Sequence, residues 1–214
     1  MFPKISGIVA AVCLTVAVLA VPFSIHQTKQ VVAASTAAPA YTATGEMLPP
    51  ENYREWVYLT SGLDMSYNPK VAGMPGHSMF DNVFVNPAAY RSFLATGTWP
   101  DKTVMVLEAR EAGSKSSINE HGRFQSGGVM GLEVHVKDEA RFKGKWAFFG
   151  FESPDKNGTL IPQEVPCYSC HAAHAAVDTT FVQFYPTLLP VATKKGTLSK
   201  AFLNEEAALA AAAK

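Results

Sequence analysis

The segment Cys167-Tyr168-Ser169-Cys170-His171 constrains this chain more than any other part of its sequence. It has the pattern C-x-x-C-H, in which two thiols stand three residues apart and a histidine follows the second. Each thiol is placed to form a thioether with one vinyl group of a haem, and the histidine then lies under the iron as its proximal ligand. The pattern predicts covalent haem c, one per chain, held by Cys167 and Cys170, with His171 as the metal ligand.

Two other uses of a C-x-x-C pair stay open at this point. A thioredoxin-like redox pair is typical of a βαβ context, whereas Pro162 and Pro166 precede this motif in a region that looks rich in strands. A zinc site needs two more ligands, and the only other cysteine, Cys13, lies in an apolar N-terminal run. His174 or another histidine remains available to zinc, but no second ligand pair has suitable spacing. Haem attachment is therefore favoured.

The N-terminus has the layout of a secretory signal. Residues 1–4 are cationic, residues 5–21 are apolar and uncharged, and small residues dominate 33–40. The alternative is an uncleaved membrane anchor, because a run of about 17 residues is near the lower limit for crossing a bilayer. Export to the periplasm agrees with the motif, since c-type cytochromes are matured outside the bacterial cytoplasm. We expect a signal or anchor with leader over 1–38, a haem domain over 39–200 and an Ala-rich tail over 201–214.

The charge balance argues against a nucleic-acid partner. The chain has 18 Lys and Arg against 18 Asp and Glu, so its formal net charge is zero. Its basic residues also form no cluster along the sequence of the kind that binds nucleic acid. After removal of the signal about 175 residues remain, which is enough for one compact domain.

Hydrophobic periodicity and turn residues predict one α+β domain built on an antiparallel sheet with flanking helices and a C-terminal haem-attachment helix. The expected helices cover 51–58, 86–97 and 167–177, with a further helical stretch after Asn204. The expected strands cover 80–85, 103–109, 129–136 and 146–151, whereas 61–77 and 113–128 are expected to be loops.

The sixth iron position decides between an electron carrier, which fills it with Met or His, and a ligand-binding protein, which leaves it open. His174 lies one turn after His171 on the same helix face, so it cannot reach the opposite side of the haem. It is expected to contact a propionate or to be an ordinary surface histidine. The formal candidates for the sixth ligand are Met65, Met74, Met79, Met105, Met130, His77, His121 and His135.

An ordered series of segments extends over nearly the whole mature chain. The C-x-x-C-H motif is followed by Asp178, Phe181 and Phe184-Tyr185-Pro186. The earlier segments are Asn52-Tyr53-Arg54-Glu55-Trp56-Val57, Val83-Phe84-Val85-Asn86-Pro87 with Tyr90, Thr96-Gly97 with Asp101, Thr103-Val104-Met105-Val106, Gly131-Leu132-Glu133, Val136-Lys137-Asp138, Arg141-Phe142 and Trp146-Ala147-Phe148. In its order and spacing this series resembles the cytochrome P460 family.

The resemblance implies an antiparallel sheet with flanking helices, a homodimer, and a five-coordinate haem with His171 as proximal ligand. The family contains two kinds of protein. Cytochromes P460 oxidise hydroxylamine and carry a lysine crosslinked to the haem, whereas cytochromes c′-beta lack the crosslink and bind gases such as NO and CO under an apolar cap. The crosslinking lysine lies in a strand reading V-x-V-K-E, and that position holds Leu107 here. Leucine has no nucleophilic nitrogen, so no such crosslink is expected.

Strand alternation places Leu107 and Met105 on one face and Glu108 on the other, which predicts an apolar distal wall. Phe80 is a further candidate for that wall. Asp81 aligns with the distal arginine of some P460 proteins and is a candidate proton acceptor. The leading hypothesis is a binding protein for NO or a related small ligand. The alternatives are an oxidoreductase acting on hydroxylamine or NO, and a six-coordinate electron carrier with a redox partner protein.

Overall fold

The computed structural model describes residues 38–66 and 78–213. The chain divides into two units, residues 1–35 and 36–214, and every described residue belongs to the second. The expected signal or anchor, and the candidate ligands Met74 and His77, lie outside the described residues. Within them, no helix is both long enough and apolar enough to cross a membrane.

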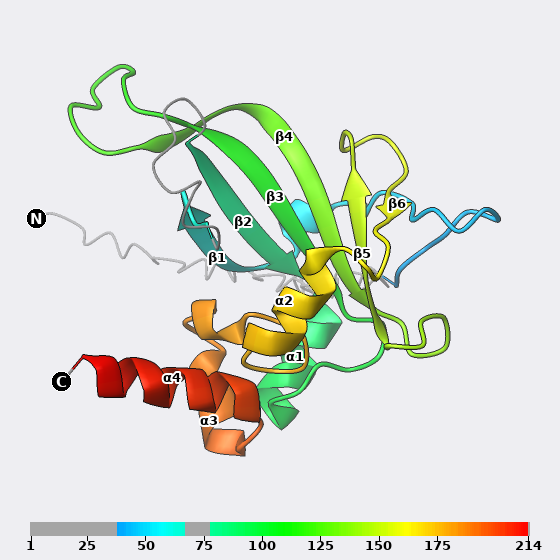
Figure 1. Cartoon of the computed structure of the whole chain (residues 1–214). Coiled ribbons are helices and arrows are strands. Elements are labelled where there is room, and N and C mark those ends of the chain that lie inside the picture. The colour runs from blue at the N-terminus through cyan, green and yellow to red at the C-terminus, as the bar shows by residue number, and fades with distance from the viewer. Residues whose placement is uncertain (1–37, 67–77, 214) are drawn as a thin grey trace, which may run out of the picture. The chain divides into compact units, whose positions relative to one another are not determined.

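An antiparallel sheet of six strands forms the centre of the described fold (Figure 1). Neighbouring strands in the sheet are also neighbours in the sequence, so the sheet is a simple meander with order β1 to β6. The strands are β1 (Val57–Leu63), β2 (Met79–Val85), β3 (Val104–Gly113), β4 (Phe124–Lys137), β5 (Trp146–Phe151) and β6 (Thr159–Leu160).

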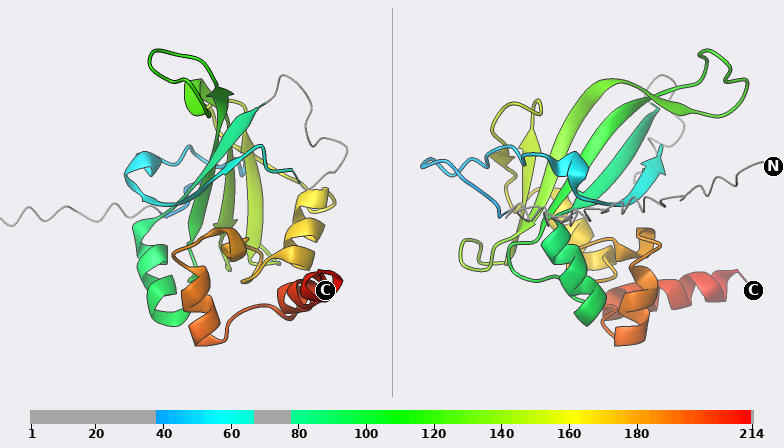
Figure 2. Two further views of the ribbon diagram at one scale, coloured as in Figure 1. Left: turned by 90° about the vertical axis from the view of Figure 1, so that its left-hand side faces the viewer. Right: turned by 180° about the vertical axis from the view of Figure 1, so that it is seen from behind.

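The helices gather at one end of the sheet, and the connection between β3 and β4 projects from the other end (Figures 1 and 2). This arrangement confirms the predicted α+β class with a haem-motif helix in the C-terminal part. The helices are α1 (Pro87–Thr96), α2 (Pro166–His174), α3 (Leu189–Lys195) and α4 (Lys200–Ala212), with single 3₁₀ turns at Tyr53–Glu55 and Val182–Phe184.

Helix α1 shows how local sequence sets its ends. Pro87 occupies the first helical position, where its missing N–H costs nothing, and Gly97 ends the helix with φ 77°. Asn86 stands at the N-cap, but its side chain does not cap the helix. It accepts a hydrogen bond from the Val104 backbone N–H (2.9 Å) and donates to the Lys102 carbonyl (3.2 Å) instead. Asn86 therefore ties the helix to β3.

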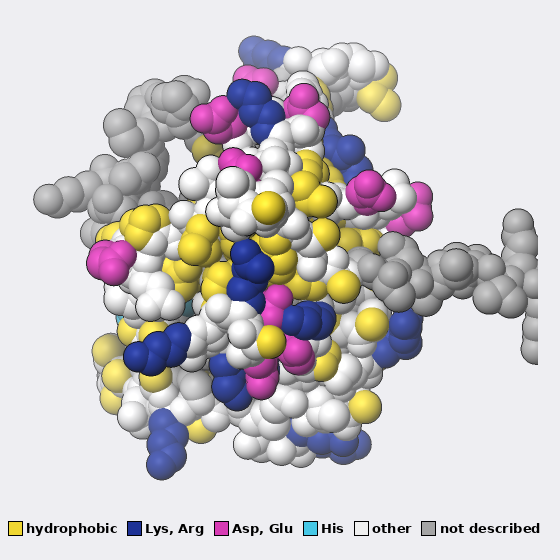
Figure 3. Space-filling view, turned by 90° about the vertical axis from the view of Figure 1, so that its right-hand side faces the viewer, with side chains coloured by type: hydrophobic (Ala, Val, Ile, Leu, Met, Phe, Trp, Pro, Cys, Tyr) yellow, Lys and Arg dark blue, Asp and Glu magenta, His cyan; other side chains and the backbone are white. Residues whose placement is uncertain are grey.

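Side chains alternate between the two faces of the sheet, and each face contributes to its own hydrophobic core. One core joins the sheet to the helices, and its buried members include Met105, Trp146 and Leu188. The other joins the opposite face to the chain that precedes β1, with Tyr53, Val106 and Phe149 among its members. On the surface next to β5 and β6, acidic and basic side chains are intermingled with hydrophobic ones (Figure 3).

Five expectations about elements are corrected. The predicted helix over 51–58 is only a single 3₁₀ turn followed by β1, because Val57–Leu63 pairs with β2, with Trp56 buried in one core and Leu59 in the other. For the same reason the expected loop over 61–77 loses residues 61–63 to β1. The expected loop over 113–128 is shorter, since β3 and β4 extend into it. Helix α2 ends at His174 rather than 177, and the last helix begins at Lys200, where the Ser199 side chain caps it.

Candidate haem-binding site

Helix α2 presents the C-x-x-C-H motif next to the edge of β5. Val165 is its N-cap residue and Pro166 opens the helix, so it starts directly before the motif. Both thiols are partly exposed and are not joined by a disulfide. Burial, reinforced by the nearby Glu133 carboxylate, raises the pKa of the Cys167 thiol.

Tyr168, between the two cysteines, fastens α2 to the sheet. Its hydroxyl donates to the Ile161 carbonyl (2.9 Å) and accepts from the Phe148 backbone N–H (3.2 Å). Its ring also meets the Phe148 ring edge-on, with centroids 4.9 Å apart. Sequence reasoning gave this residue no role, because C-x-x-C-H leaves its middle positions unspecified.

His171 is oriented as a metal-binding histidine. Its Nδ1 lies 2.7 Å from the Thr179 carbonyl oxygen, and since a carbonyl only accepts, Nδ1 carries the proton. Nε2 is then the nitrogen with a lone pair for a metal, which is the arrangement common to metal-ligating histidines. Burial lowers the pKa of His171, which favours the neutral ring that ligation requires.

Aromatic rings surround His171 on the sheet side and the loop side. Phe181 lies 4.2 Å from it and Phe148 4.7 Å from it, centroid to centroid. His135 meets it edge-on at 5.2 Å. These contacts limit rotation of the imidazole, so the ring direction is set by packing as well as by the Thr179 carbonyl.

His135 belongs to the same side as His171. It stacks on Phe148 with centroids 4.0 Å apart and planes 11° apart, and Trp146 covers it at 4.4 Å. Its Nε2 lies 3.2 Å from the Thr179 hydroxyl. Burial, followed by the neighbouring His171, lowers the pKa of His135 well below its ordinary value. This histidine therefore supports the proximal side and does not face it as a sixth ligand.

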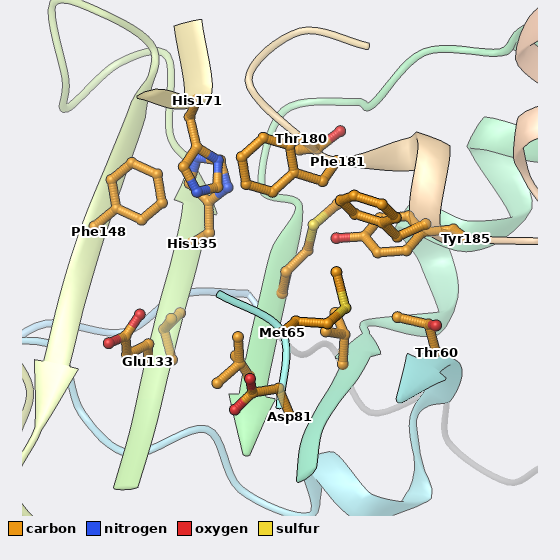
Figure 4. A pocket seen from close by; sticks show the side chains of 15 residues that line it. Thr60, Met65, Asp81, Glu133, His135, Phe148, His171, Thr180, Phe181 and Tyr185 are labelled. Atoms are coloured by element: carbon orange, nitrogen blue, oxygen red, sulfur yellow. The ribbon is translucent and has the colours of Figure 1, made fainter. Parts of the chain in front are cut away.

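A cavity of about 210 Å³ adjoins His171, and the sheet forms its floor (Figure 4). Strand pairing aligns Met105, His135 and Phe148 in one row across β3 to β5, and aligns Val83, Leu107 and Glu133 in the next row across β2 to β4. The lining residues are Thr60, Met65, Asp81, Val83, Met105, Leu107, Glu133, Val134, His135, Phe148, His171, Thr180, Phe181, Phe184 and Tyr185.

The predicted distal residues Leu107 and Met105 both line this cavity. Glu108 points to the opposite face, as alternation predicts, and is buried among Arg54, Arg110 and Tyr53, all of which donate hydrogen bonds to it. These bonds outweigh the cost of burial and hold the pKa of Glu108 below its ordinary value.

The expectation for Phe80 is corrected. Asp81 and Val83 of β2 line the cavity, and alternation turns Phe80 to the other face of the strand, the face of Phe84. Phe84 packs there against Tyr53, with ring centroids 5.7 Å apart. Val83 therefore lines the cavity where the sequence had offered Phe80.

Two carboxylates lie at the end of the cavity away from His171, those of Asp81 and Glu133 (Figure 4). Burial raises the pKa of Asp81 to about 6, and the negative charges of Glu133 and Asp64 add to the effect. A carboxylate with such a pKa exchanges protons near neutral pH. Sequence reasoning had singled out Asp81 and had given Glu133 no role, because an acidic residue in a strand carries no specific signal.

Of the formal candidates for a sixth ligand, Met65, Met105 and His135 line the cavity, and His135 does so beside His171. Met79, Met130 and His121 are absent from its lining. His174 is also away from it: Nδ1 pairs with the Glu205 carboxylate of α4 at 3.1 Å, and both side chains are about half exposed.

The residues present fit a haem c group. Two thiols and a histidine whose Nε2 is left for a metal stand on one helix, and a cavity lined mainly by apolar side chains adjoins that histidine. In the described part of the chain, no group of three or more His, Cys, Asp or Glu side chains is placed to hold a metal ion, so nothing there supports the zinc alternative.

Comparison with known proteins agrees with this geometry. The family model for cytochrome P460 matches residues 50–182, which is more than half of the chain and includes the C-x-x-C-H motif and the strands of the cavity floor. No curated protein matches the sequence. The chain therefore belongs to the cytochrome P460 family and is a haem-binding cytochrome.

Proposed function

We propose that this protein is an exported c-type cytochrome with one haem, whose open distal site binds NO or a related small ligand. The haem is attached through Cys167 and Cys170 and ligated by His171. The observation that carries the proposal is the position of Leu107, which lines the cavity on the strand where crosslinked relatives carry lysine.

The distal wall decides which ligands are stabilised. Val83, Met105 and Leu107 line it and offer no hydrogen-bond donor, so they give no selective support to bound O₂. NO and CO bind iron without such a donor. A haem bound here would supply the iron that takes the ligand, His171 Nε2 would be its protein ligand, and the apolar side chains would surround the bound gas.

A second function, oxidation of hydroxylamine or NO, has one specific observation in its favour. Asp81 lines the cavity, and its pKa of about 6 makes it a base for substrate protons at neutral pH. We place this function second because Leu107 removes the crosslink that accompanies hydroxylamine oxidation in relatives.

A single pair of variants separates the two functions. Asp81→Asn is expected to leave NO affinity within about two-fold while abolishing any hydroxylamine turnover. Steady turnover by the unaltered protein, lost in Asp81→Asn, would replace the binding function by the oxidoreductase. Leu107→Lys is expected to restore the crosslinking position and red-shift the absorption bands. An unchanged spectrum in a folded, haem-loaded variant would contradict the assignment of Leu107.

Export and dimerisation are parts of the same proposal. The N-terminal signal layout supports export, and the family resemblance supports a homodimer. The intact mass of the protein recovered from the periplasm tests both cleavage and the addition of one haem, and light scattering gives the oligomeric state. A full-length mass with membrane association would favour the anchor instead.

A further inference from the structure

Thr179 makes two hydrogen bonds that lead in different directions. Its carbonyl oxygen accepts from His171 Nδ1 at 2.7 Å, and its hydroxyl lies 3.2 Å from His135 Nε2. Thr179 therefore links the two histidines by hydrogen bonds. Their rings also meet edge-on, with centroids 5.2 Å apart. We propose that His135, acting through the Thr179 hydroxyl, is a positioning residue that sets the strength of the proximal hydrogen bond of His171.

His135 is a rigid point from which to hold Thr179. It belongs to β4, its side chain is packed between Phe148 and Trp146, and only 8% of its surface is exposed. Stacking on Phe148 and the tilted ring contact with Trp146 leave the imidazole little freedom to rotate. Its Nε2 thus has a fixed position, and the Thr179 hydroxyl is held to it.

The turn that contains Thr179 needs such support. It begins after α2 and includes Asp178 in a left-handed conformation with φ 51°. Thr180 is fixed from the other side, because its hydroxyl accepts from Trp99 Nε1 (2.7 Å) and donates to the Val177 carbonyl (2.8 Å). The hydroxyl of Thr179 itself is held by the bond to His135, so this bond orients the carbonyl that His171 uses.

The hydrogen bond from His171 Nδ1 to the Thr179 carbonyl matters because its strength affects how strongly His171 Nε2 binds the iron. A histidine that donates a stronger Nδ1–H bond is a more basic ligand at Nε2, and this favours the ferric state of the iron. If Thr179 is released, its carbonyl moves from its best position and the bond weakens. The iron–histidine bond then weakens and the reduction potential rises.

The test compares haem-loaded variants by resonance Raman spectroscopy of the ferrous form and by redox titration. Thr179→Val keeps the shape of the side chain and removes the hydroxyl, and His135→Phe keeps the stacking and removes Nε2. Both are expected to lower the iron–histidine stretching frequency and to raise the potential. The double variant is expected to shift no further than the larger single variant, because both changes break one connection.

Two controls separate positioning from general disturbance. Thr179→Ser retains the hydroxyl and is expected to keep the unaltered values, and His174→Phe removes an exposed histidine on the same helix and is also expected to have no effect. Unmoved values in Thr179→Val, or additive shifts in the double variant, would overturn the proposal. Because Thr179 is partly exposed, Thr179→Val decides the matter even if His135→Phe does not fold.

This inference rests on the proposed ligation by His171, and the two fail differently. A missing iron–histidine band in the unaltered protein would overturn both. A band that is present but insensitive to Thr179→Val would overturn only the role of His135.

Discussion

The two sides of the cavity are built by different means. On the side of His171, hydrogen bonds and stacked rings fix each group, from Tyr168 on α2 to His135 in the sheet. On the far side, Leu107 and Val83 only fill space, and Asp81 is the group that responds to pH. One side of the cavity is thus held rigidly by hydrogen bonds and ring contacts, whereas the other is shaped by apolar side chains with carboxylates at its far end.

The largest effect is expected from removing the proximal ligand. In His171→Ala the thioethers remain possible, but the iron loses its protein nitrogen, so the iron–histidine band disappears and the absorption spectrum changes. His174→Ala, one turn further along α2, is the matched control and is expected to keep the spectrum. Equal spectra for His171→Ala and the unaltered protein would assign ligation to another residue.

The aromatic support of the proximal side should also be costly to remove. Phe148 is buried and contacts His135, His171 and Tyr168. Phe148→Ala is expected to lower the free energy of unfolding by about 3–5 kcal/mol, because it leaves a cavity among these rings. Chemical denaturation measures this loss. The control Ile118→Ala, at a residue 92% exposed, is expected to change it by less than about 0.5 kcal/mol.

Asp81 gives the distal side a defined pH dependence. Its folded pKa of about 6 lies above the ordinary 3.8, so between these values the folded state binds more protons than the unfolded state. Its contribution to stability therefore falls as pH rises from about 4 to about 6 and stays unfavourable above that. Asp81→Asn is expected to stabilise the protein at pH 8 by roughly 1–2 kcal/mol, since solvent screens this partly exposed carboxylate.

The stabilisation by Asp81→Asn should largely vanish near pH 4, because Asp81 is then protonated in the folded protein and is as uncharged as the asparagine that replaces it. Unfolding curves at several pH values measure it. A stabilisation that is the same at pH 4 and pH 8 would mean that the charge of Asp81 is not the cause. Val83→Ala, on the same strand and in the same lining, is the control whose effect should not depend on pH.

The smallest effect is expected at the fastening of α2. Tyr168→Phe keeps the ring contact with Phe148 and removes the hydroxyl that bonds Ile161 and Phe148, so a loss of about 1–2 kcal/mol in unfolding free energy is expected. Hydrogen exchange of the Phe148 amide should accelerate in the variant. Unchanged exchange would show that the ring alone holds α2 on the sheet.

Motifs and alternation predicted the parts of the molecule that depend on local rules. The helix from Pro87 to Gly97 follows from its end residues, and the opposite directions of Leu107 and Glu108 follow from the pleat of β3. Residues 51–58 were misjudged because Tyr53 and Trp56 are buried in one core and Val57 packs against the other, and this burial imitates a helical period. The Thr179 connection was beyond prediction, because it depends on a turn that brings residues 135, 171 and 179 together in space.

The most direct test of the central claim is an optical spectrum of the purified mature protein, ferric and ferrous, before and after addition of NO. We expect a five-coordinate high-spin ferrous spectrum that changes when NO binds. A low-spin six-coordinate spectrum that does not respond to NO would contradict it. The sixth position would then be filled by a side chain, with Met65 and Met105 as the lining methionines to replace first, and electron transfer would become the function.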